Sequence, residues 1–211
     1  MPRKPRVNRE QIVDAAIQLI DREGLEAFTM AKLGAELGVE AMSLYNHFSS
    51  KGELLDEIAE VAVANIKVPH DYEDWEDFIR NVLRSVRQLA CEHPNLFPMV
   101  LERVPNLLAE ARLIEAYLKL MRSAGFSGEQ SIVALQVLAG FTIGYALSEI
   151  RGFVFQPGRS ALNARELSPK SFPEIRALAT YFESVDRSSE FEAGLDLVLA
   201  SLRMELKKDT R

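Results

Sequence analysis

The apolar residues of this chain recur at helical spacing along most of its length, and this pattern constrains the fold more than any other feature. The first clear segment follows the i, i+3, i+4, i+7, i+8 template of a one-sided helix; its apolar residues are Ile12, Ala15, Ala16, Leu19 and Ile20. Asn8 precedes it with Gln11 three residues later, which is typical of a capping box, and Gly24 follows as a left-handed cap. We therefore expect the first helix at Arg9–Glu23.

Further caps and periodic segments predict helices in the rest of the chain. Thr29 can cap a short second helix, Gly38 supplies a turn in which a positive φ costs little, and a third short helix follows. Ser50 and Glu53 form a second capping-box pair that opens a fourth helix. Longer segments predict helices at about residues 74–93, 94–103, 107–124, 127–151, 173–182 and 189–207, with an exposed loop at 156–172. No strand alternation competes, so the expected fold class is all-α, with about ten helices.

Composition limits the function classes. A chain of 211 residues can hold one or two domains around a sizeable core. Its 25 basic and 31 acidic residues leave a net charge of −6, so any nucleic-acid site must be local. The single cysteine cannot form an internal disulfide, the first 30 residues lack a secretory signal, and the longest near-apolar run, 138–147, is about half of a membrane span. These features predict a cytoplasmic protein that does not cross a membrane.

Residues 29–48 have the proportions of a helix-turn-helix, and Ala41, Leu44 and Phe48 share one face of its second helix. A helix that reads the major groove needs polar groups for base edges, small apolar groups for thymine methyls, and hydroxyls or amines for phosphates. The remaining surface supplies this mixture through Met42, Ser43, Tyr45, Asn46, His47 and Lys51. Two short helices about a glycine turn also occur as an ordinary packing corner, so that alternative stays open.

Positive charge at the start of the chain favours DNA binding. The first nine residues contain no acid and four basic residues, namely Arg3, Lys4, Arg6 and Arg9. A basic arm beside a reading helix suits contacts with the minor groove or the phosphate backbone. A solvated N-terminus without such a role is the alternative.

The segment TMAKLGAELGVEAMSLYNHFSSKGELLDEIA resembles the DNA-binding signature of the Tet-repressor (TetR) family of bacterial regulators. Beyond it, DWEDFIRNVLRSVRQLACEHP, GFTIGYAL and FEAGLDLVL are similar to the C-terminal region of the tetracycline-responsive branch, so nearly the whole chain is covered. The resemblance implies a three-helix DNA-binding domain at 1–50 with its basic arm at 1–9, a linking helix at 51–67, and a bundle for ligand binding and dimerisation at 68–211.

The family pattern implies two kinds of contact with a double-stranded operator. Thr29, Tyr45 and Lys51 would bind phosphates, and the residues near base edges would be Met42, Ser43, Asn46 and His47. Many relatives have an arginine just after the capping threonine, whereas this chain has Met30 and Ala31, which leaves Lys32 as the nearby basic residue. The operator sequence of the relatives therefore does not carry over.

The resemblance also implies a small-molecule inducer, although not a magnesium–tetracycline complex. Val100 stands where tetracycline-binding members place a metal-ligating histidine, and Val82 and Val86 stand where they place asparagine and phenylalanine. Because valine offers Mg²⁺ no ligand atom, we expect no metal and no cofactor. The expected lining suits a mostly apolar organic ligand; it comprises Phe78, Val82, Val86, Val100, Arg103, Tyr117, Gln136, Phe141 and Tyr145.

Catalytic arrangements are not recognisable in the sequence. Cys91 and His93 are two residues apart on a predicted helix and so point about 200° apart, which excludes a nucleophile–base pair. His47 and His93 have no Cys, His, Asp or Glu four residues away. We expect a protein that is not an enzyme. The alternative to a repressor is a helical adaptor that binds another protein and lacks sequence-specific DNA binding.

The last predicted helix carries an apolar stripe wider than a monomer of this size should expose; its members are Phe191, Leu195, Val198, Leu199, Leu202 and Leu206. Together with the resemblance, the stripe and the helix at 127–151 imply a four-helix homodimer interface, and Gly140 and Gly144 would let another helix approach closely. A homodimer would read a palindromic operator. A ligand that binds more tightly to a dimer whose DNA-binding domains are misplaced for the two half-sites would release the dimer from the operator.

Overall fold

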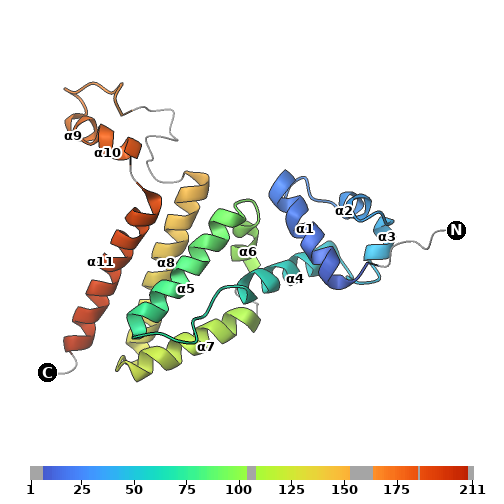
Figure 1. Cartoon of the computed structure of the whole chain (residues 1–211), viewed down its shortest axis with the longest axis horizontal. Helices are drawn as coiled ribbons and strands as arrows, with labels where there is room; N and C mark the ends of the chain where they lie inside the picture. Colours follow the sequence, from blue (N-terminus) through green and yellow to red (C-terminus); the bar gives the residue numbers. More distant parts are fainter. Residues whose placement is uncertain (1–6, 104–107, 153–163, 185, 209–211) are drawn as a thin grey trace. The chain divides into compact units, whose positions relative to one another are not determined.

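The computed structural model describes residues 7–103, 108–152, 164–184 and 186–208, and within them the chain forms eleven α-helices and no strand (Figure 1). The predicted all-α class is confirmed. The helices are α1 Arg9–Glu23, α2 Met30–Glu36, α3 Ala41–Leu44, α4 Lys51–Ala64, α5 Trp75–Glu92, α6 Phe97–Arg103, α7 Leu108–Ser123, α8 Gly128–Arg151, α9 Pro173–Ala177, α10 Ala179–Ser184 and α11 Arg187–Lys208.

Side-chain caps set the starts of the first helices, largely as predicted. The Asn8–Gln11 capping box at α1 is complete. At α4 the Ser50 hydroxyl accepts from the Glu53 amide, but the Glu53 carboxylate accepts from the Ser49 amide. The second predicted capping box is therefore only half formed, because its acidic side chain reaches one residue further back.

Three later helices differ from the predicted spans. α6 begins at Phe97 and not at Pro94, because the His93 carbonyl accepts from two successive amides in a turn. Residues 173–182 are divided into α9 and α10. α11 begins two residues earlier than predicted, because the Asp186 carboxylate accepts from the amides of the helix's second and third residues. Of the loop predicted at 156–172, residues 156–163 lie outside the described residues, and the rest forms turns.

The helices form two compact units that do not follow chain order. The first comprises Met1–His70 with Gln88–Lys119, and the second comprises Asp71–Arg87 with Leu120–Arg211. Residues 88–119, expected in a C-terminal domain starting at residue 68, thus pack with the N-terminal helices. The sequence-based boundaries and the packing units describe different divisions of the chain.

The core of the first unit lies between α1, α4 and α6. α4 packs against both of the other helices, and its fully buried Ile58 belongs to the same core cluster as Ile12 of α1 and Val100 of α6. α2 and α3 pack on each other as the two arms of the helix-turn-helix. Gly34 permits this, since a Cβ there would lie 2.9 Å from the Val39 carbonyl oxygen.

In the second unit, α8 and α11 lie side by side (Figure 1). A Cβ on Gly194 of α11 would lie 2.7 Å from the Phe141 ring of α8, so any other residue there would displace this ring. Phe141 stacks on Phe191 with ring centroids 5.4 Å apart. Phe191, Leu195 and Leu199 are fully buried within the chain. The predicted exposed stripe is therefore wrong at these positions, because the stripe packs against α8 of its own chain.

A different apolar surface is exposed on the same two helices. On α8 it comprises Ile132, Val133 and Val137, and on α11 it comprises Leu197 and Met204. Because α8 is apolar on this face as well as on its buried face, it is the one described helix that is long and apolar enough to cross a membrane. The ten-residue apolar run at 138–147 did not indicate this in the sequence.

Candidate nucleic-acid interface

The second helix of the helix-turn-helix presents the predicted face to solvent. Leu44 and Phe48 are buried, whereas 71% of Met42 and 41% of Tyr45 are exposed. Asn46 is also exposed, and Ser43 and His47 are half-buried. Regular α3 is only one turn, and a hydrogen-bonded turn continues it to residue 48. The side chains predicted to approach base edges therefore lie together on one short segment.

Thr29 and Lys32 stand at the start of α2. The Thr29 hydroxyl oxygen accepts from the Lys32 amide at 3.2 Å, which is the N-cap bond, and its own proton can still be donated to a phosphate. The Lys32 ammonium lies 2.7 Å from the Glu23 carboxylate, and this hydrogen bond lowers the pKa of Glu23. The positive charge of Lys32 is therefore partly offset by Glu23.

Lys51 at the start of α4 is held differently. Its ammonium donates to the Phe28 carbonyl oxygen at 2.7 Å and lies 5.1 Å from the centre of the Phe28 ring. Both partners are uncharged, so the positive charge is not neutralised. Lys51 thereby binds the residue next to Thr29, so two of the three predicted phosphate-binding residues lie close together.

The predicted basic arm is only partly described. Arg3, Lys4 and Arg6 lie outside the described residues. Arg9 belongs to α1, where its guanidinium binds Glu53, Glu57 and the His47 carbonyl. Arg9 therefore departs from the picture of a free arm, because it is engaged with the end of the helix-turn-helix.

The residues predicted to line a ligand site are distributed over both units. Val100, Arg103 and Tyr117 lie in the first unit, where Arg103 pairs with Asp56 and Tyr117 is buried, which raises the pKa of its hydroxyl. The remaining six lie in the second unit. Phe78 and Val82 are buried there and Val86 is half-buried, whereas Gln136 is exposed and does not join them.

Phe141 and Tyr145 meet at a polar and aromatic cluster that the sequence analysis missed. The Tyr145 hydroxyl donates to the Glu190 carboxylate at 2.9 Å, and burial together with this bond raises its pKa. Arg87 of α5 makes two 2.8 Å bonds to Glu149 of α8 and lies 5.3 Å from the centre of the Phe191 ring. Arg87 is thus a bridge between α5, α8 and α11.

Arginines of α5 also face carboxylates of α11. Arg84 makes hydrogen bonds of 2.6 and 2.8 Å to Glu192, and Arg80 pairs with Glu192 and Asp196. The helical spacing of charges on both segments was the signal available in the sequence. Within the described part of the chain, no group of three His, Cys, Asp or Glu side chains is placed to hold a metal ion.

The geometry defines a class: an all-helical DNA-binding protein whose helix-turn-helix presents its second helix to solvent. Residues 12–58 match the family described as bacterial regulatory proteins, tetR family, and residues 68–206 match the tetracyclin repressor-like C-terminal domain. The chain belongs to the TetR family, as its sequence indicated, and is a ligand-responsive DNA-binding repressor.

Several known proteins are similar to this chain over nearly its full length. Tetracycline repressor protein class D of Escherichia coli is 29% identical over 209 residues, which cover 95% of this chain and 91% of that protein. The class A repressor from transposon 1721, also of Escherichia coli, is 30% identical, with 90% and 88% covered. Apo ActR from Streptomyces coelicolor has a TM-score of 0.77 at 28% identity, with 96% and 98% covered, and its complex with actinorhodin has a TM-score of 0.76.

Proposed function

We propose that this chain represses transcription in the cytoplasm by binding a palindromic operator as a homodimer, and that a small organic molecule releases it. The observation that carries the proposal is the exposed reading face, where Met42, Tyr45 and Asn46 project beside buried Leu44 and Phe48. An apolar side chain as exposed as Met42 suits a thymine methyl in the major groove. Thr29, Tyr45 and Lys51 would hold the flanking phosphates, together with Lys32.

The exposed apolar surface of α8 and α11 supports the homodimer. An added Cβ at Gly140 or Gly144 would meet nothing within 4 Å in this chain, so both glycines leave room for a second copy's helix. Val137 lies on the same face of α8, one turn before Gly140. Two reading helices related by a two-fold axis match two half-sites of a palindrome.

The ligand we propose is mostly apolar and is not a magnesium–tetracycline complex. Val82 and Val100 are buried, and neither offers oxygen or nitrogen to Mg²⁺. Calorimetry with tetracycline and Mg²⁺ tests this: we expect no micromolar binding. Tight binding that a chelator abolishes would contradict it and would show that Val100 is wrongly matched to the metal-binding position.

We further propose that the chain has no catalytic activity, in line with relatives that are transcriptional repressors.

The experiment that decides between a repressor and a helical adaptor is selection of random duplexes by the purified protein. Enrichment of a palindromic sequence supports the repressor. If the folded protein enriches no sequence, the alternative of a helical adaptor takes its place.

A further inference from the structure

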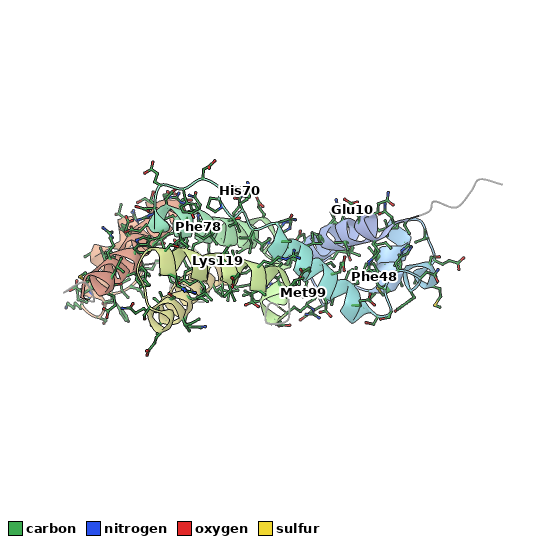
Figure 2. All side chains as sticks on the ribbon, turned by 90° about the horizontal axis from the view of Figure 1, so that it is seen from below. Glu10, Phe48, His70, Phe78, Met99 and Lys119 are labelled. Atoms are coloured by element: carbon green, nitrogen blue, oxygen red, sulfur yellow. The ribbon has the colours of Figure 1, made fainter. Side chains whose placement is uncertain are left out.

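Arg9, the first residue of α1, reaches the far end of the reading segment. Its guanidinium donates to the His47 carbonyl oxygen and lies 4.1 Å from the centre of the Phe48 ring. It also pairs with Glu57 at 3.1 Å and with Glu53 at 3.5 Å. Figure 2 labels Phe48, which follows the turn after α3, and Glu10 of α1, the neighbour of Arg9; both belong to the first unit.

These contacts matter because the reading helix is too short to hold itself. α3 has four residues, and a helix of this length gains almost nothing from its own hydrogen bonds. Buried Leu44 and Phe48 anchor one side of it. In the turn that follows α3, the Arg9 guanidinium donates to the His47 carbonyl oxygen and so satisfies it.

Glu53 extends the same arrangement to the connection between α3 and α4. Its carboxylate accepts from the Ser49 amide and the Ser49 hydroxyl, both at 2.6 Å. These two bonds, more than Arg9, lower the pKa of Glu53, so the carboxylate stays ionised. Arg9, Glu53 and Ser49 therefore hold the last turn of the reading segment against α1.

We propose that Arg9 is a positioning residue for DNA reading and not a phosphate contact. It sets the angle at which Met42, Ser43 and Asn46 meet the major groove. Two carboxylates within 3.5 Å of its guanidinium repel a phosphate from the same place. The inference rests on the proposed function, since it requires a preferred operator.

The test compares Arg9→Lys and Arg9→Gln with Lys51→Ala on the selected operator and on a random duplex, over a range of salt concentrations. Lysine keeps the charge but lacks the planar fork that binds a carbonyl and carboxylates together. We expect both Arg9 variants to lose roughly tenfold in operator affinity, the cost of one charge-assisted hydrogen bond, with an unchanged salt slope and unchanged affinity for the random duplex.

Two results would overturn the proposal. If Arg9→Gln lowers the salt slope by about one and weakens both duplexes together, as expected for Lys51→Ala, Arg9 is a phosphate contact. If the Arg9 variants bind the operator like the wild type, the residue has no role in reading. If wild type selects no operator at all, the proposed function fails first.

Two further measurements keep the test decisive if the Arg9 variants fold poorly. Glu57→Gln is a milder substitution than a change of Arg9. It should lower operator affinity if the Arg9–Glu57 pair positions α3, and it should strengthen binding to all DNA if Arg9 faces a phosphate. Hydrogen exchange without DNA should be faster at the amides of 46–49 in Arg9→Lys and unchanged in the α1 core. Equal exchange at 46–49 would contradict the positioning role.

Discussion

The Arg103 Nε at the end of α6 lies 3.0 Å from the Asp56 Oδ1 on α4. The Arg103 Nε is buried and the contact is an ion pair without good hydrogen-bond alignment, whereas the Asp56 side chain is 64% exposed. One turn further along α4, Glu60 accepts from the Ala109 amide at the start of α7. Two carboxylates of α4 thus bind the end of α6 and the start of α7, within the unit that carries the reading helix.

Removing Arg103 and removing Asp56 should lower the free energy of unfolding by different amounts. Asp56→Ala leaves a buried guanidinium nitrogen without its counter-charge, so we expect a loss of about 1 kcal/mol in the free energy of unfolding. Arg103→Met leaves an exposed carboxylate that water solvates, and should cost less. Urea denaturation measures both, with Glu115→Ala of the exposed Glu115–Lys119 pair as the control. A larger loss in Arg103→Met would contradict this account of the pair.

Lys51 and Ser43 should affect DNA binding in different ways. Lys51→Ala should weaken binding to all duplexes about equally and lower the salt slope by roughly one, since its charge is not neutralised by Phe28. Ser43→Ala should change preference at one half-site position, if its hydroxyl contacts a base. Tyr45→Phe removes only a hydroxyl and serves as the intermediate variant. A salt slope that is unchanged in Lys51→Ala would show that the phosphate contact lies elsewhere.

Dimerisation can be separated from folding by two substitutions. Val137→Glu places a charge on the exposed face of α8, and should give a folded monomer in sedimentation experiments. Leu199→Glu buries a charge in the chain's own core, and should unfold the second unit. Wild-type protein should be a dimer at micromolar concentration. A wild-type monomer, or a dimeric Val137→Glu variant, would place the interface elsewhere.

The Arg84–Glu192 contact predicts a pH-dependent contribution to stability. Hydrogen bonds from Arg84 lower the pKa of Glu192 below its ordinary value of 4.5. A carboxyl whose pKa is lower in the folded state stabilises the protein above its unfolded pKa, and this is lost as pH falls through the folded pKa. The wild type should therefore exceed Glu192→Gln in unfolding free energy at neutral pH. The difference should vanish in acid, and a difference that grows in acid would refute the assignment.

Local signals predicted much of the fold. Apolar periodicity and caps placed α1, α5, α7 and α8 within about one residue, and the caps of Asn8, Thr29 and Ser50 formed as expected. These features depend on neighbours in sequence. The exposed reading face was likewise predictable, because Leu44 and Phe48 repeat at i, i+4 and leave the rest of the segment outward.

Contacts between distant segments could not be predicted in the same way. The sequence assigned Arg9 to a basic arm, since nothing local shows that Glu57, 48 residues away, binds its guanidinium. It also took the stripe through Leu199 as exposed, because periodicity identifies an apolar face but not its partner. Gln136 was expected to line a ligand site, but its side chain is exposed in this chain. This exposure was not predictable for the same reason.

Two copies of this chain should bind the two half-sites of one operator. The most direct measurement is the mass of the complex between purified protein and the selected duplex, compared with a duplex in which one half-site is scrambled. We predict two protomers on the intact duplex and a loss of specific binding on the scrambled one. One protomer per duplex, bound equally well to both, would contradict the claim.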